Sequence, residues 1–179
     1  MSIDDLELLK YPIGRFQPPA DQQVESLSAE IERLASLPGR LTAALAGFND
    51  EQFNTPYRPG GWTITQLVHH LADSHLHAWI RIKWALSEDH PSIKAYDEKK
   101  YAETPDNQLP PSISLKLLDA HHLKWSSTLR LLQPEQFERS FIHPATGASI
   151  TVKRMVYLYA WHGDHHLAHI TQLKQRMGW

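Results

Sequence analysis

Apolar residues recur at the spacing of an α-helix in four long stretches of the chain. In one of them Leu115, Leu118, Trp125 and Leu129 fall on a single stripe together with His122. The pattern predicts four amphipathic helices, each long enough to bury one face against the others. These helices are expected over residues 28–47, 63–87, 112–132 and about 151–177.

Polar and helix-breaking residues mark several of the predicted helix ends. Thr63 is a candidate N-cap, with Gln66 at the capping-box position three residues later. Gly178 is expected to stop the last helix. Pro38 lies inside the first helix, where its missing N–H predicts a kink or a restart.

The segments outside these helices carry turn-forming residues. Residues 1–27 are interrupted by proline and glycine, so we expect an extended N-terminal arm. Residues 89–111 are expected to form a loop, and residues 141–150 predict a small β-hairpin that turns at Ala145-Thr146-Gly147. All 179 residues are expected to form one domain.

The two halves of the chain repeat each other's motifs. A Glu-Gln-Phe triplet precedes the second helix at residues 51–53 and the fourth at residues 135–137. A His-His-Leu-Ala motif then occurs within each of these helices, at residues 69–72 and 165–168. The sequence therefore predicts an all-α four-helix bundle with internal pseudo-two-fold symmetry and a small β-hairpin insertion.

Composition excludes several classes of function. Net charge is -2 and Lys and Arg are mixed with acids, so neither nucleic acid nor a membrane surface is an expected partner. There are no cysteines, which excludes disulfides and thiolate ligands, whereas the 12 histidines are unusually many. With acids rather than positive charge at the N-terminus, we expect a cytoplasmic protein acting on a small molecule.

The last predicted helix carries its histidines on one side. With His162 as the origin and about 100° per residue, His166 lies at about +40°, His169 at about −20° and His165 at about −60°. His162 and His166 are four residues apart, the spacing that lets two imidazoles bind one ion from successive turns. The pair differs from a His-Glu-x-x-His protease motif because Gly163 stands where the catalytic Glu would be.

A third ligand is expected from the second predicted helix. His70 and Asp73 are both candidates, since they are about 60° apart on that helix, and geometry does not choose between them. His69 turns away from His70 by about 100°.

Long motifs in this chain resemble the DinB-like superfamily, and within it the YfiT group of metal-dependent hydrolases, which includes bacillithiol S-transferases. The similarity extends almost from end to end. It is carried by Tyr11-Pro12-Ile13-Gly14, the Thr55 to Thr63 segment, His69-His70-Leu71-Ala72-Asp73-Ser74-His75, the Pro91 to Lys99 segment, the Tyr159 to Ile170 segment and Arg176-Met177-Gly178-Trp179.

The resemblance implies a metal ligand set and an assembly. The family's metal ligands match His70, His162 and His166, so the resemblance selects His70 over Asp73. It also implies a homodimer. Where this chain has Gly163-Asp164, a relative has Ser-His, and Asp164 points away from the predicted metal.

Three functions agree with a three-histidine site that leaves coordination positions open. The first is hydrolysis by a metal-activated water, the second is S-transfer from a low-molecular-weight thiol, and the third is metal or small-molecule binding without catalysis. One divalent ion per subunit is expected, Zn²⁺ first and Ni²⁺ as the alternative. Asp73 and His169 are candidates for orienting the water or relaying its proton, and Tyr57, Arg58 and Trp62 for lining the pocket mouth.

Overall fold

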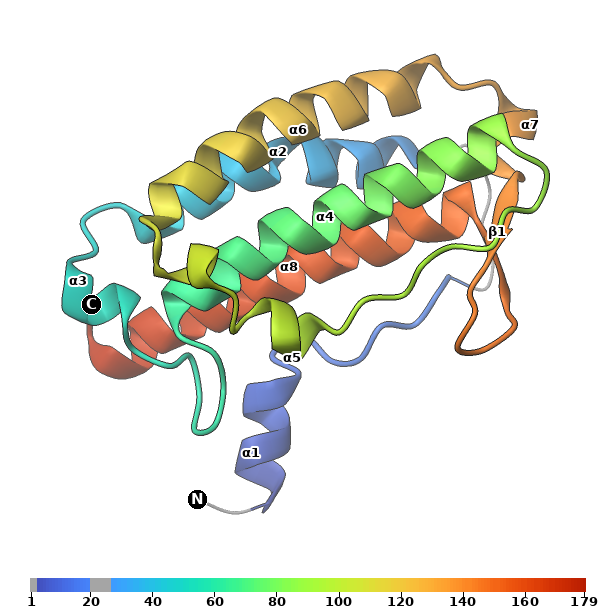
Figure 1. Ribbon diagram of the computed structural model, residues 1–179. Coiled ribbons are helices and arrows are strands. Elements are labelled where there is room, and N and C mark those ends of the chain that lie inside the picture. Colours follow the sequence, from blue (N-terminus) through green and yellow to red (C-terminus); the bar gives the residue numbers. More distant parts are fainter. Residues whose placement is uncertain (1–2, 20–26) are drawn as a thin grey trace.

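The computed structural model describes residues 3–19 and 27–179 and consists mainly of four long helices packed as a bundle (Figure 1). Helix α2 packs against α6 and α8, and α4 packs against the same two helices. This arrangement confirms the predicted all-α four-helix bundle. The long helices are α2 (Leu27–Leu45), α4 (Ile64–Ser87), α6 (Pro111–Leu131) and α8 (Val152–Met177).

Short elements connect the long helices and repeat between the two halves. Helix α3 (Asp50–Phe53) precedes α4, and α7 (Pro134–Phe137) precedes α8, so each Glu-Gln-Phe triplet lies in a short helix ahead of a histidine-bearing one. The predicted hairpin is confirmed. Its antiparallel strands β1 (Ser140–Ile142) and β2 (Ser149–Thr151) lead directly into α8.

The helix ends follow the predicted capping chemistry. The Thr63 hydroxyl accepts a hydrogen bond from the Gln66 backbone N–H, and the Gln66 side chain accepts one from the Thr63 N–H. Gly178 ends α8 in the left-handed conformation, at φ 70°, which glycine adopts without a Cβ penalty. These two residues set where α4 begins and where α8 ends.

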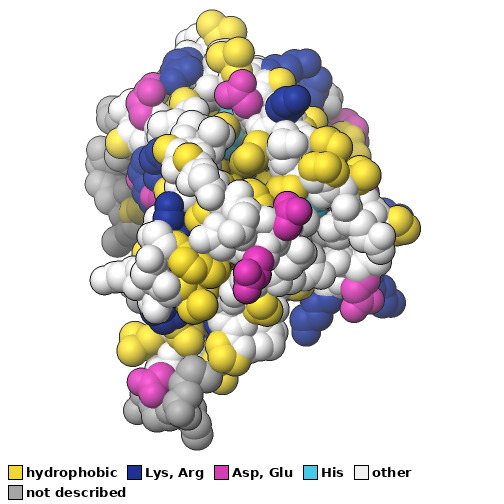
Figure 2. Space-filling view, turned by 90° about the vertical axis from the view of Figure 1, so that its left-hand side faces the viewer, with side chains coloured by type: hydrophobic (Ala, Val, Ile, Leu, Met, Phe, Trp, Pro, Cys, Tyr) yellow, Lys and Arg dark blue, Asp and Glu magenta, His cyan; other side chains and the backbone are white. Residues whose placement is uncertain are grey.

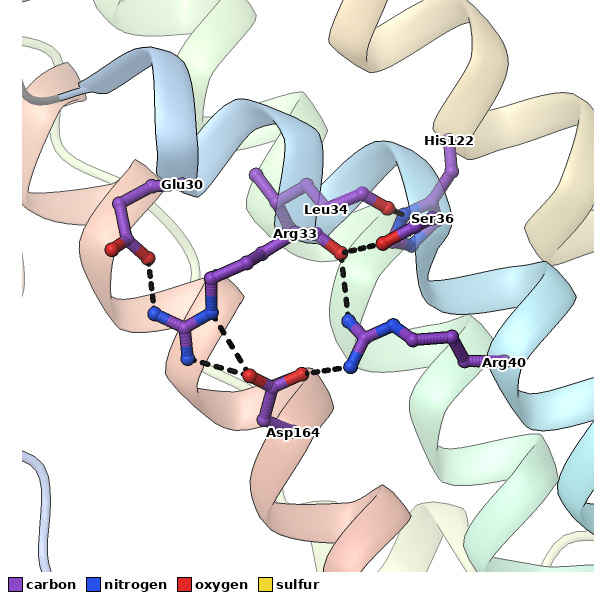
Figure 3. A network of polar contacts seen from close by, with 7 residues as sticks. All are labelled: Glu30, Arg33, Leu34, Ser36, Arg40, His122 and Asp164. Carbon is purple, nitrogen blue, oxygen red and sulfur yellow. Dashed lines mark hydrogen bonds and ion pairs between the residues drawn. The ribbon is translucent and has the colours of Figure 1, made fainter.

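Helix α2 is continuous through Pro38, so the predicted restart is wrong. A proline at this position leaves the Leu34 carbonyl without its usual N–H partner four residues later. The structure supplies another donor, because Nδ1 of His122 on α6 lies 2.7 Å from that oxygen (Figure 3). The helix therefore continues through Pro38 with its buried carbonyl satisfied.

Helix α8 crosses α2 closely beside an ionic network. A Cβ at Gly163 would overlap the end of the Leu37 side chain, so any larger residue there would require Leu37 to move. On the next residue, Asp164 accepts hydrogen bonds from Nη2 of Arg33 at 2.6 Å and from Nη1 of Arg40 at 2.6 Å (Figure 3). These contacts set the rotation of α8, and with it the direction of its histidines.

Buried histidines divide the apolar core into two clusters. The hairpin-end cluster is built around Trp125 and Phe141, and the opposite cluster is built around Leu41 and Leu71. Between them, all four long helices pass through a layer that contains most of the buried histidines. The buried histidines of the described chain are His69, His70, His75, His121, His122, His165, His166 and His169.

Two predicted loops contain more structure than expected. Residues 3–10 form helix α1 (Ile3–Lys10) rather than part of an extended arm, because the proline and glycine residues all lie after it. The predicted loop over 89–111 contains α5 (Glu98–Tyr101) and the 3₁₀ helix η2 (Pro105–Gln108). Residues 20–26 of the predicted arm lie outside the described residues.

The surface matches the balanced composition. On the end face drawn in Figure 2, Lys and Arg side chains are scattered among acids and form no single patch, and little histidine is visible. Among the described residues, no helix combines the length and apolar character needed to cross a bilayer.

Candidate metal centre

Three histidines converge in the middle of the bundle, one from α4 and two from α8. Nε2 of His162 lies 3.4 Å from Nε2 of His70 and 3.2 Å from Nε2 of His166. A tetrahedral ion bonded to nitrogens at about 2.0–2.1 Å would hold two ligand nitrogens about 3.3–3.4 Å apart. The two distances from His162 are thus close to those of a divalent ion site, and the ligand atoms of all three residues lie within 4.8 Å of one another.

The electrostatics of this cluster favour neutral imidazoles. Burial lowers the pKa of His70 to about 4. Burial also holds the pKa of His162 and of His166 well below the usual range, and the neighbouring imidazoles lower both further. All three rings are therefore uncharged near neutral pH and offer lone pairs to an ion.

A cavity of about 660 Å³ opens onto the three histidines. Tyr57, Arg58 and Trp62 line it, as the sequence predicted for the loop that enters α4. The Trp62 ring packs on His70 with 4.6 Å between ring centroids. A small molecule can thus reach the cluster while an aromatic wall shields one ligand from water.

His169 lies in the same cavity, one turn beyond His166 on α8. Its ring centroid is 4.1 Å from that of Tyr57 and 5.5 Å from that of His166. Burial and the nearby His165 lower its pKa to about 3. The backbone of Leu9 and Lys10 approaches the ring and partly offsets that lowering, although neither ring nitrogen has a close hydrogen-bond partner among the described residues.

Nitrogen atoms of His165, His166 and His169 also lie within 4.8 Å of one another. The His165 ring stacks on Trp161 with 4.7 Å between centroids. This second group borders the same cavity and shares His166 with the first. Every histidine that the wheel placed on that side of α8 therefore borders one cavity.

Asp73 lies outside this constellation, contrary to its predicted role as ligand or proton relay. It is absent from the cavity wall, and burial followed by the nearby Asp106 raises the pKa of its carboxyl. Asp73 is four residues after His69, so the two share a face of α4. That face is turned to η2 and α6, where His69 contacts Ser114 Oγ at 2.7 Å and the Leu109 carbonyl oxygen at 3.0 Å.

His75 contacts the site although sequence reasoning gave it no role there. Its Nε2 lies 3.2 Å from Nδ1 of His162. The helical wheel places His75 about 140° from His70, so the periodicity of α4 alone does not put it at the site. Only the depth at which α8 packs against α4 brings the two rings together, and a single-helix wheel carries no information on that depth.

Comparison with protein families matches residues 33–170 to the DinB superfamily. Two relatives align over nearly their whole length. "Putative metal-dependent hydrolase OB0782" of Oceanobacillus iheyensis is 48% identical over 95% of this chain and 98% of its own. "Putative metal-dependent hydrolase YfiT" of Bacillus subtilis is 46% identical over 96% of this chain and 97% of its own.

A solved structure has the same fold. YfiT from Bacillus subtilis, described as a probable metal-dependent hydrolase with an unusual four-helix bundle topology, superposes with a TM-score of 0.93 at 46% sequence identity. The match covers 96% of this chain and 99% of the other. The similarity thus extends over nearly the whole fold.

Proposed function

The chain belongs to the DinB superfamily, and from that membership and its convergent histidines we propose that it is a metal-dependent hydrolase acting on a small molecule. The observation that carries the proposal is the spacing of the Nε2 atoms of His70, His162 and His166, with 3.4 Å and 3.2 Å from His162 to the other two. Three neutral imidazoles beside an open cavity are typical of catalytic metal sites, because structural sites are closed by a fourth protein ligand.

The proposed ligands are His70, His162 and His166, which would hold one divalent ion per subunit. Three imidazoles suit Zn²⁺, and Ni²⁺ is the alternative. When bound, such an ion supplies Lewis acidity and lowers the pKa of water to about 7. Within the described chain, no carboxylate or other anionic group joins the three-histidine cluster, so the ion would keep its positive charge toward the substrate.

His169 is proposed to orient the water or the substrate within the cavity. As a neutral ring it offers one N–H donor and one lone pair, and no described residue makes a close hydrogen bond to either, although the Leu9 and Lys10 backbone lies near the ring. Its pKa of about 3 makes it a weak base, so we assign it hydrogen bonding rather than storage of a proton. Tyr57 packs on its ring and restricts the direction of that hydrogen bond.

The proposal is tested by hydrolysis assays on protein whose metal content has been measured. Chromogenic esters and amides would be incubated with wild-type protein, with protein stripped by a chelator, and with stripped protein reloaded with Zn²⁺ or Ni²⁺. We expect hydrolysis that is lost on stripping and restored on reloading. His70→Ala should lose most of the bound metal and the activity together, because it removes one of three ligands.

A neighbouring histidine supplies a matched control. His69 is next to His70 in sequence, but its ring faces Ser114 and Leu109 instead of the cavity. Metal content and activity should therefore persist in His69→Gln. Fully loaded wild-type protein that hydrolyses none of the panel would overturn the hydrolase proposal. A low-molecular-weight thiol and a fluorogenic electrophile, added to the same preparation, would then test S-transfer.

A further inference from the structure

The contact between His75 and His162 joins a buried residue to a proposed metal ligand. Nε2 of His75 lies 3.2 Å from Nδ1 of His162, and His75 has no exposed surface. Its ring is held by aromatic neighbours on two other helices, His122 at 4.9 Å and Tyr159 at 5.1 Å between centroids. Because these rings enclose it, His75 cannot turn away from His162 without disturbing the core.

The two rings must share one proton between the facing nitrogens. Nε2 of His162 faces the other two ligands, so it can bind an ion only as a lone pair. In a neutral imidazole the proton then resides on Nδ1, which donates to Nε2 of His75. The reverse arrangement, with His75 donating, puts the His162 proton on Nε2 and blocks the ligand position.

No other group in the described chain competes for this nitrogen. His75 Nε2 is the hydrogen-bond partner that the described residues give to Nδ1 of His162, whereas metal-binding histidines elsewhere commonly use a carboxylate or a carbonyl. On the far side of His75, Nδ1 is buried without a partner among the described residues. Nε2 of His75 thus contacts one polar atom among the described residues, which is Nδ1 of His162.

We propose that His75 is the positioning residue that keeps Nε2 of His162 free to bind the ion, by accepting the hydrogen bond from Nδ1 of His162. The inference rests on the metal site proposed above and adds a determinant of its affinity. In the loaded protein His162 carries its proton on Nδ1, and His75 carries its own on Nδ1. Both rings stay neutral and no proton is gained or lost by the pair.

Metal affinity tests this assignment without recourse to activity. Zn²⁺ would be titrated into stripped protein in competition with a chromogenic chelator. His75→Phe keeps the ring volume but removes the acceptor, and we expect it to weaken binding by roughly 10- to 100-fold. His75→Gln restores an acceptor oxygen and should recover most of the loss. His69→Gln, at a ring that faces Ser114 and the Leu109 carbonyl instead of His75 or a ligand, should leave the affinity unchanged.

Nitrogen NMR on wild-type protein labelled with ¹⁵N-histidine gives a second readout, which stands even if His75→Phe does not fold. The expected spectrum of the Zn²⁺-loaded protein shows His162 protonated on Nδ1 and His75 protonated on Nδ1. Wild-type affinity in a folded His75→Phe variant, or His162 protonated on Nε2 in the loaded protein, would overturn the assignment. Wild-type protein that binds no ion would instead overturn the metal site itself.

Discussion

The hydrogen bond from His122 to the Leu34 carbonyl makes a sharp prediction about coupling between two helices. Pro38 removes the backbone donor that an ordinary residue would direct at this oxygen. His122 Nδ1, at 2.7 Å, takes its place from α6. If His122 compensates for the N–H that Pro38 lacks, the loss of stability on replacing His122 must depend on whether residue 38 is proline.

The magnitude follows from the burial of the group. Leu34 is 1% exposed, so its carbonyl has no ready access to water once His122 is gone. A buried carbonyl left without a partner costs about 1–3 kcal/mol. His122→Phe also removes the ring's own buried and unpaired Nε2, which is a gain in stability. The measured effect of this single change is therefore the cost of the unpaired carbonyl minus that gain. Pro38→Ala supplies a backbone N–H to the same oxygen and isolates the first term.

The assay is a double-mutant cycle on metal-free protein near pH 7. Free energies of unfolding in urea would be measured for wild type, His122→Phe, Pro38→Ala and the double variant. We expect His122→Phe to cost about 1–3 kcal/mol more in the wild-type background than in the Pro38→Ala background. A coupling energy within about 0.5 kcal/mol of zero would refute the reasoning, since independent sites add to that accuracy.

Three further predictions concern stability. Burial lowers the pKa of His122 to about 4, against about 6.5 in the unfolded chain. The contribution of neutral His122 to the free energy of unfolding is therefore complete above a pH of about 6.5. About 3 kcal/mol of it is lost as pH falls from there to about 4. Urea midpoints of metal-free wild type should fall more steeply over that range than those of His122→Phe, and parallel curves would contradict this. Gly163→Ala should cost about 1–3 kcal/mol through overlap with Leu37. Thermal melts should show a smaller loss of stability from Gly163→Ala when it is made in a Leu37→Ala background. Asp164→Ala should cost about 1 kcal/mol in about 50 mM salt and less in about 1 M NaCl, and equal losses in both salts would refute the ionic origin.

The sequence predicts those parts of this fold that depend on local chemistry. Thr63 and Gly178 act through their own backbone or the next turn, so the limits of α4 and α8 could be predicted. The i, i+4 spacing of His162 and His166 likewise specifies one face of one helix.

Contacts between helices were not predictable in the same way. Asp73 and His70 differ by about 60° on the wheel, and only the packing of α4 against α6 shows that Asp73 faces away from the cavity. The continuity of α2 through Pro38 depends on a donor from another helix, His122, which lies 88 positions beyond Leu34 in the chain. His75 reaches His162 because two helices approach closely, and no pattern within α4 reports that approach.

The histidine layer also bears on how the bundle comes apart. Two apolar clusters lie on either side of the polar rings, and each long helix contributes buried residues to both. An ion held by His70 on α4 and by His162 and His166 on α8 would tie these two helices together, because it binds only when both are in place. At a free concentration about 100 times its dissociation constant, it would add about 2.7 kcal/mol to folding. Metal supply would then change the stability of the whole bundle, because the two helices that the ion ties run through both clusters.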